Sequence, residues 1–473
     1  MTDRLASPSG RVTLNIQDDG GLVLYHDGLP VWQASDRRLP DPAPEPIPPN
    51  APPPSSQAPL PPIAGQLRCD DHSYLDDIGR RVPVFCHAGD LLLLFVEARL
   101  QGNEEKNARV HQAFLDIQRA GYSGLRSWWA ICWVTSHPFW QGRRLNPSDP
   151  DHRRLIRECL RVGAEDYRLK WHIALGDALD VSQSEMEDAW HWMSGVVNEN
   201  PDWFALVEGL NEAYGTGQSD PLEVKRWVDI SREKNPDTLH VLSAAAGANG
   251  SENPEELQRW TPDNQRIWYV HSDRAGHWGD QTRHAFSVAY HEPPRRLGWS
   301  GEPPGINWGP HQYVSVMEYA DEWTESPWRY AFYLAVTAMC RAVPTFMCSH
   351  GVILNGRFRD APGFGLAPRL ISDLPPDVMA YDDLFHGGES HESRRVVAAP
   401  PDCRADHAMK PTGECVIAIY PEQPGISTTT LRFDRGWTGR IHDEHGFTDT
   451  AIARGAHLSR DISSGLLLIG LVL

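Results

Sequence analysis

Residues 204–217 read FALVEGLNEAYGTG, and this stretch carries the pattern that decides the fold. A largely apolar run ends at the polar pair Asn211-Glu212, and a glycine-containing loop follows. Stretches with a helical pattern lie on either side, at 182–198 and 221–234. A buried strand between two helices is typical of a parallel β/α unit.

The same alternation continues from about residue 82 to residue 386. Apolar runs predict eight strands, at 83–88, 122–127, 168–174, 204–211, 238–244, 266–272, 296–302 and 344–349. Helical patterns lie between and after them, at 105–119, 151–165, 182–198, 221–234, 253–260, 278–291, 326–342 and 375–386. Eight successive β/α units favour an α/β fold, a (β/α)8 TIM barrel, over an open sheet.

The segments before and after the barrel have a different character. Residues 11–33 alternate apolar and polar side chains around glycine-rich turns, and residues 39–62 hold twelve prolines in an extended spacer. After about residue 390, short strands broken by glycine and proline predict an antiparallel β-sandwich. We therefore expect a β unit at 1–38, a proline-rich linker at 39–63, the barrel at 64–388 and the sandwich at 389–473.

Composition limits the classes of partner. The net charge of −19 disfavours nucleic acid as a partner, because binding phosphates needs a basic surface. The eight cysteines form no CxxC pair and no cluster with zinc spacing, and the acidic pairs lack calcium-loop spacing, so we expect no metal and no cofactor. A disulfide between Cys403 and Cys415 across a hairpin is a minor alternative to free thiols.

No secretory signal or membrane-spanning stretch is evident. The N-terminus lacks an apolar segment of signal-peptide type, and the apolar run 465–473 is too short to cross a bilayer. We expect no membrane association and a cytoplasmic or virion-associated location, and the sequence leaves the compartment and the oligomeric state open.

The active site of such a barrel lies at the carboxyl ends of its strands. Asn211-Glu212 at the end of the fourth strand resembles the fourth-strand motif of the large clan of retaining glycoside hydrolases that includes cellulases and mannanases. The resemblance covers the barrel and implies that Glu212 is the general acid/base and that Asn211 binds the sugar 2-hydroxyl. It also implies a nucleophilic glutamate at the end of the seventh strand.

Two glutamates are candidates for this nucleophile. Glu302 lies in GWSGEPPG and Glu318 in QYVSVMEYADEW, and each follows a plausible strand. A short connection from the helix at 278–291 favours Glu302. The GEPPG segment also resembles an element of some barrel hydrolases of phages and bacteria. The helix at 326–342 would follow Glu318 with ordinary spacing, so both remain open.

Further polar and aromatic residues are candidates for substrate contacts. Arg126 ends the second predicted strand and would hold the nucleophile ionised, and His271 or Tyr269, at the end of the sixth, would bond the nucleophile or a sugar hydroxyl. His350 ends the eighth strand, and His172 near the third is a weaker candidate. The chain holds 18 tryptophans, and a flat indole can stack on a sugar ring. Trp128 and Trp129, in a loop-like stretch, and Trp299 are candidates for this role.

The predicted function is hydrolysis of O-glycosidic bonds in an oligo- or polysaccharide by a retaining mechanism, which needs two carboxyl groups about 5–5.5 Å apart. The sequence does not indicate the sugar, the linkage, or endo against exo action. An alternative is a non-catalytic carbohydrate-binding or virion structural protein on a barrel scaffold. Residues Gln17, Asp19, Val23 and Tyr25 resemble one repeat of the bulb-type mannose-binding lectins, with Gly21 in place of the asparagine of the motif.

Overall fold

The computed structural model of the chain contains two compact units, residues 1–52 and 53–473. It describes residues 4–6, 12–16, 22–26, 29–33, 60–132, 145–178, 182–210, 221–242, 267–271, 279, 282, 285–286, 297–302, 326–347, 363–423 and 425–473. The first unit holds one antiparallel sheet in the order β1-β2-β3-β4, each strand paired with the next. These strands are β1 (Arg4–Ala6), β2 (Val12–Ile16), β3 (Leu22–His26) and β4 (Leu29–Gln33). The small β unit predicted from the alternating pattern is therefore present.

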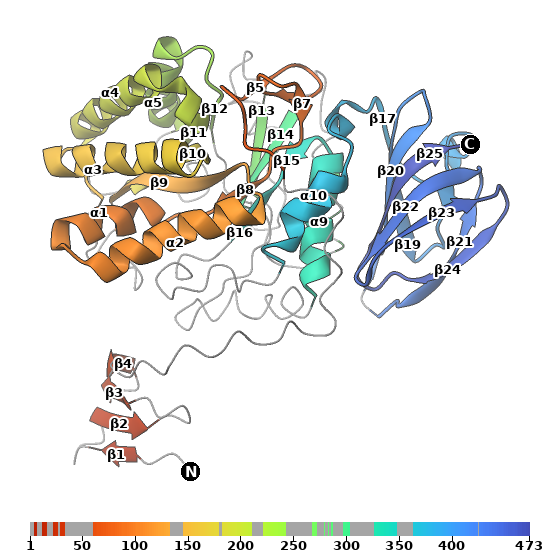
Figure 1. Cartoon of the computed structure of the whole chain (residues 1–473), viewed down its shortest axis with the longest axis horizontal. Helices are drawn as coiled ribbons and strands as arrows, with labels where there is room; N and C mark the ends of the chain where they lie inside the picture. Colours follow the sequence, from red (N-terminus) through yellow and green to blue (C-terminus); the bar gives the residue numbers. More distant parts are fainter. Residues whose placement is uncertain are drawn as a thin grey trace. The chain divides into compact units, whose positions relative to one another are not determined.

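The second unit is built around parallel strands, coloured from orange through yellow and green to teal in Figure 1. They are β8 (Phe85–His87), β9 (Gly124–Cys132), β10 (Lys170–Ala178), β11 (Phe204–Leu210), β12 (His240–Val241), β13 (Ile267–His271), β14 (Leu297–Glu302), β15 (Ala342–Val343) and β16 (Thr345–Met347). One sheet has the order β12-β11-β10-β9-β8-β16 and a second has the order β13-β14-β15. Residues 342–347 connect the two sheets, because β15 pairs with β14 and β16 pairs with β8.

These strands overlap all eight predicted strand ranges. The described residues of β12 and β13 form no ladder with each other, so the described parallel strands make a TIM-like arc. Their apolar runs fit this arrangement, since a parallel strand covered by helices is buried on both faces. In β11 every residue is buried.

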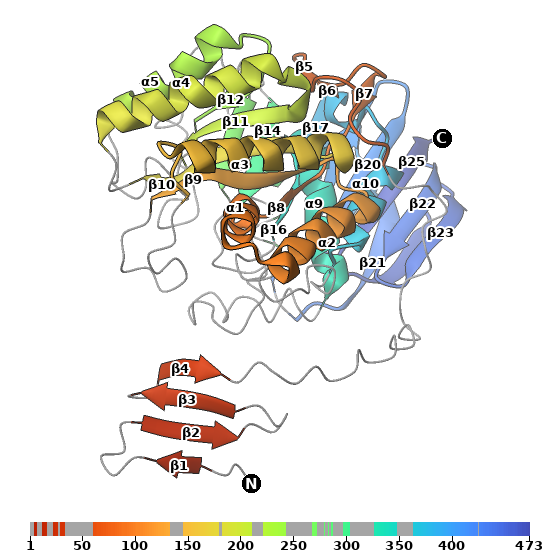
Figure 2. The same cartoon turned by 60° about the vertical axis from the view of Figure 1, so that its left-hand side comes forward.

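Helices cover the outside of this arc, as Figure 2 shows for α3, α4 and α5 over β9–β12. They are α1 (Leu91–Gln101), α2 (Glu104–Ala120), α3 (Pro150–Arg161), which continues into a π-helical turn at Val162–Asp166, α4 (Gln183–Glu199), α5 (Pro221–Lys234), α9 (Pro327–Met339) and α10 (Leu366–Asp373). Their starts follow familiar capping chemistry. Asp149 caps α3 ahead of Pro150, and Ser182 with Glu185 forms a capping box at α4.

Two secondary-structure predictions are wrong. The helix predicted at 375–386 is absent, and a 3-10 turn at Val378–Ala380 and strand β17 (Asp383–His386) stand in its place. Arg126 does not end its strand, because β9 continues to Cys132 and takes Trp128 and Trp129 out of the predicted loop. Both corrections follow from pairing with neighbours. β17 pairs with β19 (Cys403–Met409), and Ala174 on β10 is the register partner of Trp128.

Residues 383–472 form two antiparallel sheets, drawn in blue in Figure 1. The larger has the order β17-β19-β20-β25-β22-β23 and the smaller has the order β18-β21-β24. The remaining strands are β18 (Val397–Ala398), β20 (Glu414–Pro421), β21 (Thr428–Phe433), β22 (Trp437–Asp443), β23 (Gly446–Ile452), β24 (His457–Asp461) and β25 (Leu466–Val472). Side chains of both sheets share one hydrophobic cluster, which includes Ile417, Phe433 and Trp437. Cys403 and Cys415 are not bridged, because Cys403 faces Pro421 and Cys415 faces Met409 at opposite ends of one hairpin.

Helix α9 connects this C-terminal part to the parallel strands. The indole N–H of Trp328 donates to the carbonyl of Gly465 at 2.9 Å, and the ring of Phe332 packs on Tyr420. Gly465 has φ +85°, and a Cβ there would lie 2.7 Å from the Phe332 ring, so glycine is required for this close approach. A three-stranded sheet of β5 (Arg68–Cys69), β6 (Tyr74–Leu75) and β7 (Arg80–Arg81) also packs on the strands, since Tyr74 donates to the carbonyl of Gly298. Within the described residues, no helix is long and apolar enough to cross a membrane.

Candidate functional site

A group of buried polar side chains lies among the parallel strands, and three of its members are near the carboxyl ends of β8, β11 and β13. Glu208 is the third residue from the end of β11, and Tyr269 is the third from the end of β13. Arg126 and His172 come from β9 and β10, and His87 ends β8. We call these five residues the Glu208 cluster. All five are fully buried, so each polar group must find its partners inside the protein.

Arg126 and Glu208 form the centre of this cluster. The guanidinium donates from Nε to Oε2 and from Nη2 to Oε1 of the carboxylate, both at 2.9 Å, which is a bidentate pair. The Nη1 group of Arg126 lies 3.1 Å from Nδ1 of His87. Because a guanidinium can only donate, Nδ1 of His87 is the acceptor in this contact.

His172 and Tyr269 complete the shell around Glu208. Nε2 of His172 lies 2.9 Å from Oε2, and the Tyr269 hydroxyl donates to the same oxygen at 2.8 Å. Gly301 on β14 makes room for this tyrosine, since a Cβ at this position would come 1.8 Å from the hydroxyl oxygen. Oε2 therefore accepts from three side chains on three different strands.

The electrostatics keep Glu208 ionised. Burial alone would raise the pKa of this carboxyl, but the charge of Arg126 and the hydrogen bond and charge of His172 outweigh it and hold the pKa well below its ordinary value. A carboxylate that is fully buried and held anionic cannot serve as a general acid near neutral pH. Glu208 is therefore suited to hold the side chains of Arg126, His172 and Tyr269 in place and to neutralise the charge of Arg126.

The predicted catalytic residues fall largely beyond what the structure describes. Asn211, Glu212, Glu318 and His350 lie outside the described residues. β14 ends at Glu302 and β13 ends at His271, and the backbones of these two residues are register partners. The side chains of Glu302 and His271 also lie outside the described part.

Arg126 and Tyr269 were predicted as site residues, and the structure brings them together on Glu208. The prediction assigned Arg126 to the nucleophile, whereas the carboxylate that it contacts among the described residues is that of Glu208. His172, the weaker prediction, also belongs to the cluster. Arg126 lies inside the barrel rather than at its rim, because β9 extends six residues beyond it.

The three tryptophans are buried, at 2%, 0% and 0% exposure for Trp128, Trp129 and Trp299. Trp129 packs edge-on against Trp190 of α4, between strand and helix, so it is a core residue rather than a substrate contact. Trp128 lies against the ring of His87, and Trp299 lies against the ring of His172. The indole rings of Trp128 and Trp299 therefore pack against the two histidines of the Glu208 cluster.

Glu208 and His87 were not predicted from the sequence. A signal for Glu208 was present, since it is the one charged residue in the apolar run FALVEGL. Glutamate is almost never fully buried unless it is paired, so a carboxylate inside a buried strand indicates a partner elsewhere in the barrel. Among the described residues, no cluster of histidine, cysteine and carboxylate side chains is arranged to hold a metal ion.

Comparisons with known proteins identify the fold of this chain but do not identify a reaction for it. No protein-family profile matches the sequence, and no curated protein is detectably similar to it. Among solved structures, the chain is similar to one described as a glycoside hydrolase, with a TM-score of 0.56 at 9% identity over 86% of this chain and 97% of the other. It is also similar to a family 5 glycoside hydrolase from Bacteroides vulgatus, with a TM-score of 0.51 at 9% identity over 86% and 94% of the two chains. The chain therefore has the fold of glycoside hydrolases.

Proposed function

We propose that this protein is a retaining glycoside hydrolase that cleaves O-glycosidic bonds in a glycan. The observation that carries the proposal is the Glu208 cluster, a preorganised charged network inside the arc of strands that extends to the carboxyl ends of β8, β11 and β13, the end at which barrel enzymes have their active sites. The fold that the chain shares with glycoside hydrolases supports the same proposal.

In this proposal Glu212 is the general acid/base and Glu302 is the nucleophile. Glu212, four residues beyond Glu208, protonates the leaving oxygen while Glu302 attacks the anomeric carbon and the glycosidic C–O bond breaks. Glu212 then takes a proton from water, whose oxygen displaces Glu302 and restores the free enzyme. Asn211 binds the sugar 2-hydroxyl, and His271 and His350 contact the substrate or the nucleophile. Glu318 remains the alternative nucleophile.

The charge of the Glu208 cluster supports this division of roles. The charge of Arg126 is already neutralised by Glu208. In this proposal Arg126 therefore leaves no positive charge to offset the carboxyl groups of Glu212 and Glu302, which would repel each other if both were ionised. Two like charges about 5 Å apart favour protonation of one of them, which raises the pKa of the acid toward the working pH. The cluster therefore helps Glu212 to hold its proton while Glu302 stays ionised.

Arg126 and Tyr269 support the site by position. Their polar atoms are fixed on Glu208 before any substrate arrives, so little reorganisation is needed during the reaction. We assign both as positioning residues, with the three strands β9, β11 and β13 as the rigid frame that holds them.

The finer architecture is part of the same proposal. We retain the division into a β unit at 1–38, a linker at 39–63, a closed barrel at 64–388 and a C-terminal sandwich at 389–473. The two C-terminal sheets that share a hydrophobic cluster support the sandwich, and β17 adds residues 383–386 to it. Sugar binding by the lectin-like N-terminal unit stays a hypothesis.

Turnover on a panel of aryl glycosides and polysaccharides tests the function. We expect Glu212→Gln and Glu302→Gln to lower kcat by several orders of magnitude, and the matched control Glu318→Gln to remain active. Azide should partly restore Glu302→Ala and give a glycosyl azide of inverted anomeric configuration, whereas Glu212→Ala should give the retained azide with an activated leaving group. Loss of activity in Glu318→Gln alone would move the nucleophile to Glu318. If no glycan is cleaved but a glycan is bound, the non-catalytic carbohydrate-binding alternative is correct.

A further inference from the structure

A groove of about 810 Å³ opens at one end of the C-terminal sheets, separate from the Glu208 cluster. Its walls are the connection from β21 to β22, the connection from β23 to β24, and the segment at 392–393. Backbone hydrogen bonds fix these walls, since the N–H of Gly455 donates to Phe433 at 2.7 Å and the N–H of Leu473 donates to Gly436 at 2.8 Å. The volume is in the range of sites that hold small ligands.

One carboxylate in this groove is already neutralised. Asp434 accepts from Nε of Arg395 at 2.6 Å and from Nε of Arg432 at 2.9 Å. Glu392 is mostly exposed and lies 3.7 Å from the guanidinium of Arg395. Asp434 and Glu392 are therefore paired with Arg395 and Arg432, and they do not neutralise any other arginine of the groove.

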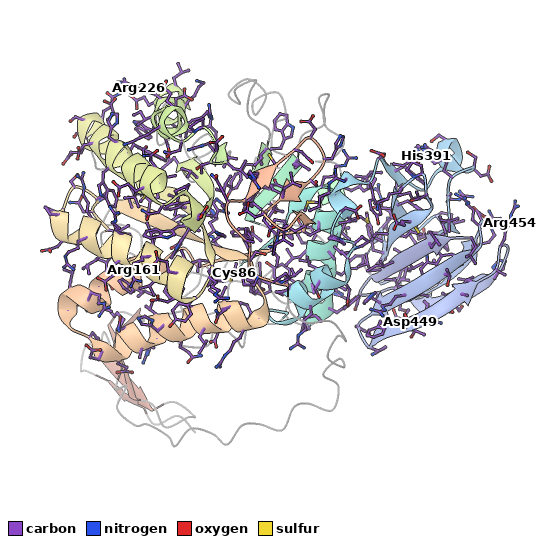
Figure 3. All side chains as sticks on the ribbon, turned by 45° about the horizontal axis from the view of Figure 1, so that its top comes forward. Cys86, Arg161, Arg226, His391, Asp449 and Arg454 are labelled. Carbon is purple, nitrogen blue, oxygen red and sulfur yellow. The ribbon has the colours of Figure 1, made fainter. Side chains whose placement is uncertain are left out.

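Two more arginines line the groove without an ion pair. Arg435 is half-buried in the connection from β21 to β22, and Arg454 is exposed in the connection from β23 to β24. Among the described residues, no carboxylate lies within 4.0 Å of either guanidinium. Figure 3 shows Arg454 at the edge of the C-terminal sheets that faces away from the helices of the barrel.

The groove therefore carries positive charge on an acidic protein. Its four arginines, counted with Arg395, face the two carboxylates Asp434 and Glu392, which leaves a net side-chain charge of +2. The whole chain has a net charge of −19, so this local excess is not a consequence of composition. A planar guanidinium that lacks a protein partner is suited to bidentate recognition of a carboxylate.

We propose that this groove binds the carboxylates of a uronic-acid-containing polysaccharide. Arg435 and Arg454 would each bind one carboxylate from successive acidic sugars along the chain. The ligand class rests on the proposed function, in which the protein acts on a glycan, and the groove would hold an acidic polysaccharide beside the barrel.

Two other ligand classes fit the groove less well. A neutral sugar usually stacks on an exposed aromatic ring, but the aromatic residue of this groove, Phe433, is fully buried. Single-stranded nucleic acid also needs aromatic platforms, together with a long basic track, and the acidic surface of this chain disfavours such a polyanion.

Calorimetric titration of the full chain with a galacturonic acid hexamer tests the proposal. We expect binding that weakens with added salt and that weakens about tenfold for each of Arg435→Ala and Arg454→Ala, because a charged hydrogen bond contributes on this scale. The matched control R154A/R161A removes the same two charges from the exposed face of α3 and should bind like the wild type. The variant R435K/R454K keeps the charge and should retain part of the affinity, which separates recognition from misfolding.

The result that overturns the proposal is equal affinity of the wild type and R435A/R454A for this hexamer, or no binding at low salt. Equal binding of the methyl-esterified hexamer also overturns it, because that ligand has no carboxylates. If a single-stranded oligonucleotide binds more tightly than the hexamer, the ligand of the groove is a nucleic acid and not a glycan. Binding and hydrolysis of the hexamer are measured in separate experiments. Hydrolysis without arginine-dependent binding refutes only the groove, and binding without hydrolysis refutes only the proposed enzyme.

Discussion

Glu208→Gln should strongly destabilise the barrel, although the substitution changes the size of the side chain very little. The amide can no longer neutralise Arg126, and its NH2 group would face one of the two guanidinium donors that now bind at 2.9 Å. Breaking a buried ion pair in this way costs about 3–5 kcal/mol, since an uncompensated charge stays inside the protein. For a chain of this size the Tm should fall by roughly 3–6 °C.

Urea and thermal unfolding of the full chain, followed by near-UV circular dichroism, measure this effect. Glu233→Gln is a matched control on the exposed surface of α5, and it should change the unfolding free energy by less than about 0.5 kcal/mol. The double variant R126M/E208L should cost clearly less than the sum of its two single variants, because it removes both charges together.

The pH dependence provides a second check on the same residue. The pKa of Glu208 is lowered in the folded protein, so its stabilising contribution is fully present above the unfolded pKa of about 4.3 and is lost as the pH falls below that value. The stability difference between wild type and Glu208→Gln should be constant from about pH 8 to pH 5 and should shrink below about pH 4.5. A Tm for Glu208→Gln within about 1 °C of the wild type would refute the reasoning.

Three further predictions concern other parts of the chain. Gly301→Ala should lower the free energy of unfolding by about 1–3 kcal/mol and displace Tyr269 from Glu208. The displacement should change the tyrosine signal in ultraviolet difference spectra. An unchanged spectrum and Tm would contradict the close contact. His407 is fully buried, its Nε2 accepts from two backbone N–H groups, and burial lowers its pKa to about 3. This side chain should therefore account for about 2 kcal/mol of the stability that the wild type loses between pH 6.5 and 5, in addition to the loss from the buried His240 and His442. His407→Gln should make the loss of stability over this pH range smaller by about this amount, and an unchanged loss would show that His407 does not contribute to it. Deleting residues 1–52 should leave the Tm of the remainder nearly unchanged, and a large fall would show that the arm stabilises it.

The parallel strands could be predicted because each is an apolar run between polar segments. Helix α1 was missed for a related reason. Its sequence LLLLFVEARLQ is apolar on nearly every side, so it has no 3.6-residue periodicity to distinguish it from a strand. β17 was mistaken for a helix because its four residues pair with β19, and a single sequence gives no sign of such a partner.

The site was predictable only in part. Strand ends locate the rim of a barrel, which is why Glu302 and His271 were placed correctly at the ends of β14 and β13. The pairing of Arg126 with Glu208 joins positions 82 residues apart, and only the three-dimensional register of β9, β10 and β11 brings them together. The burial of Trp129 likewise depends on α4, which supplies the ring of Trp190.

The most direct test of the central claim is to trap the covalent intermediate. The protein is incubated with a 2-deoxy-2-fluoro glycoside of a sugar that it cleaves, digested, and analysed by peptide mass spectrometry. A retaining mechanism with Glu302 as nucleophile predicts one glycosyl group on the peptide that contains Glu302, and none on the peptides that contain Glu212 or Glu318. A label on Glu318 would move the nucleophile, and turnover of the parent sugar without any covalent adduct and with inverted product configuration would contradict the retaining mechanism.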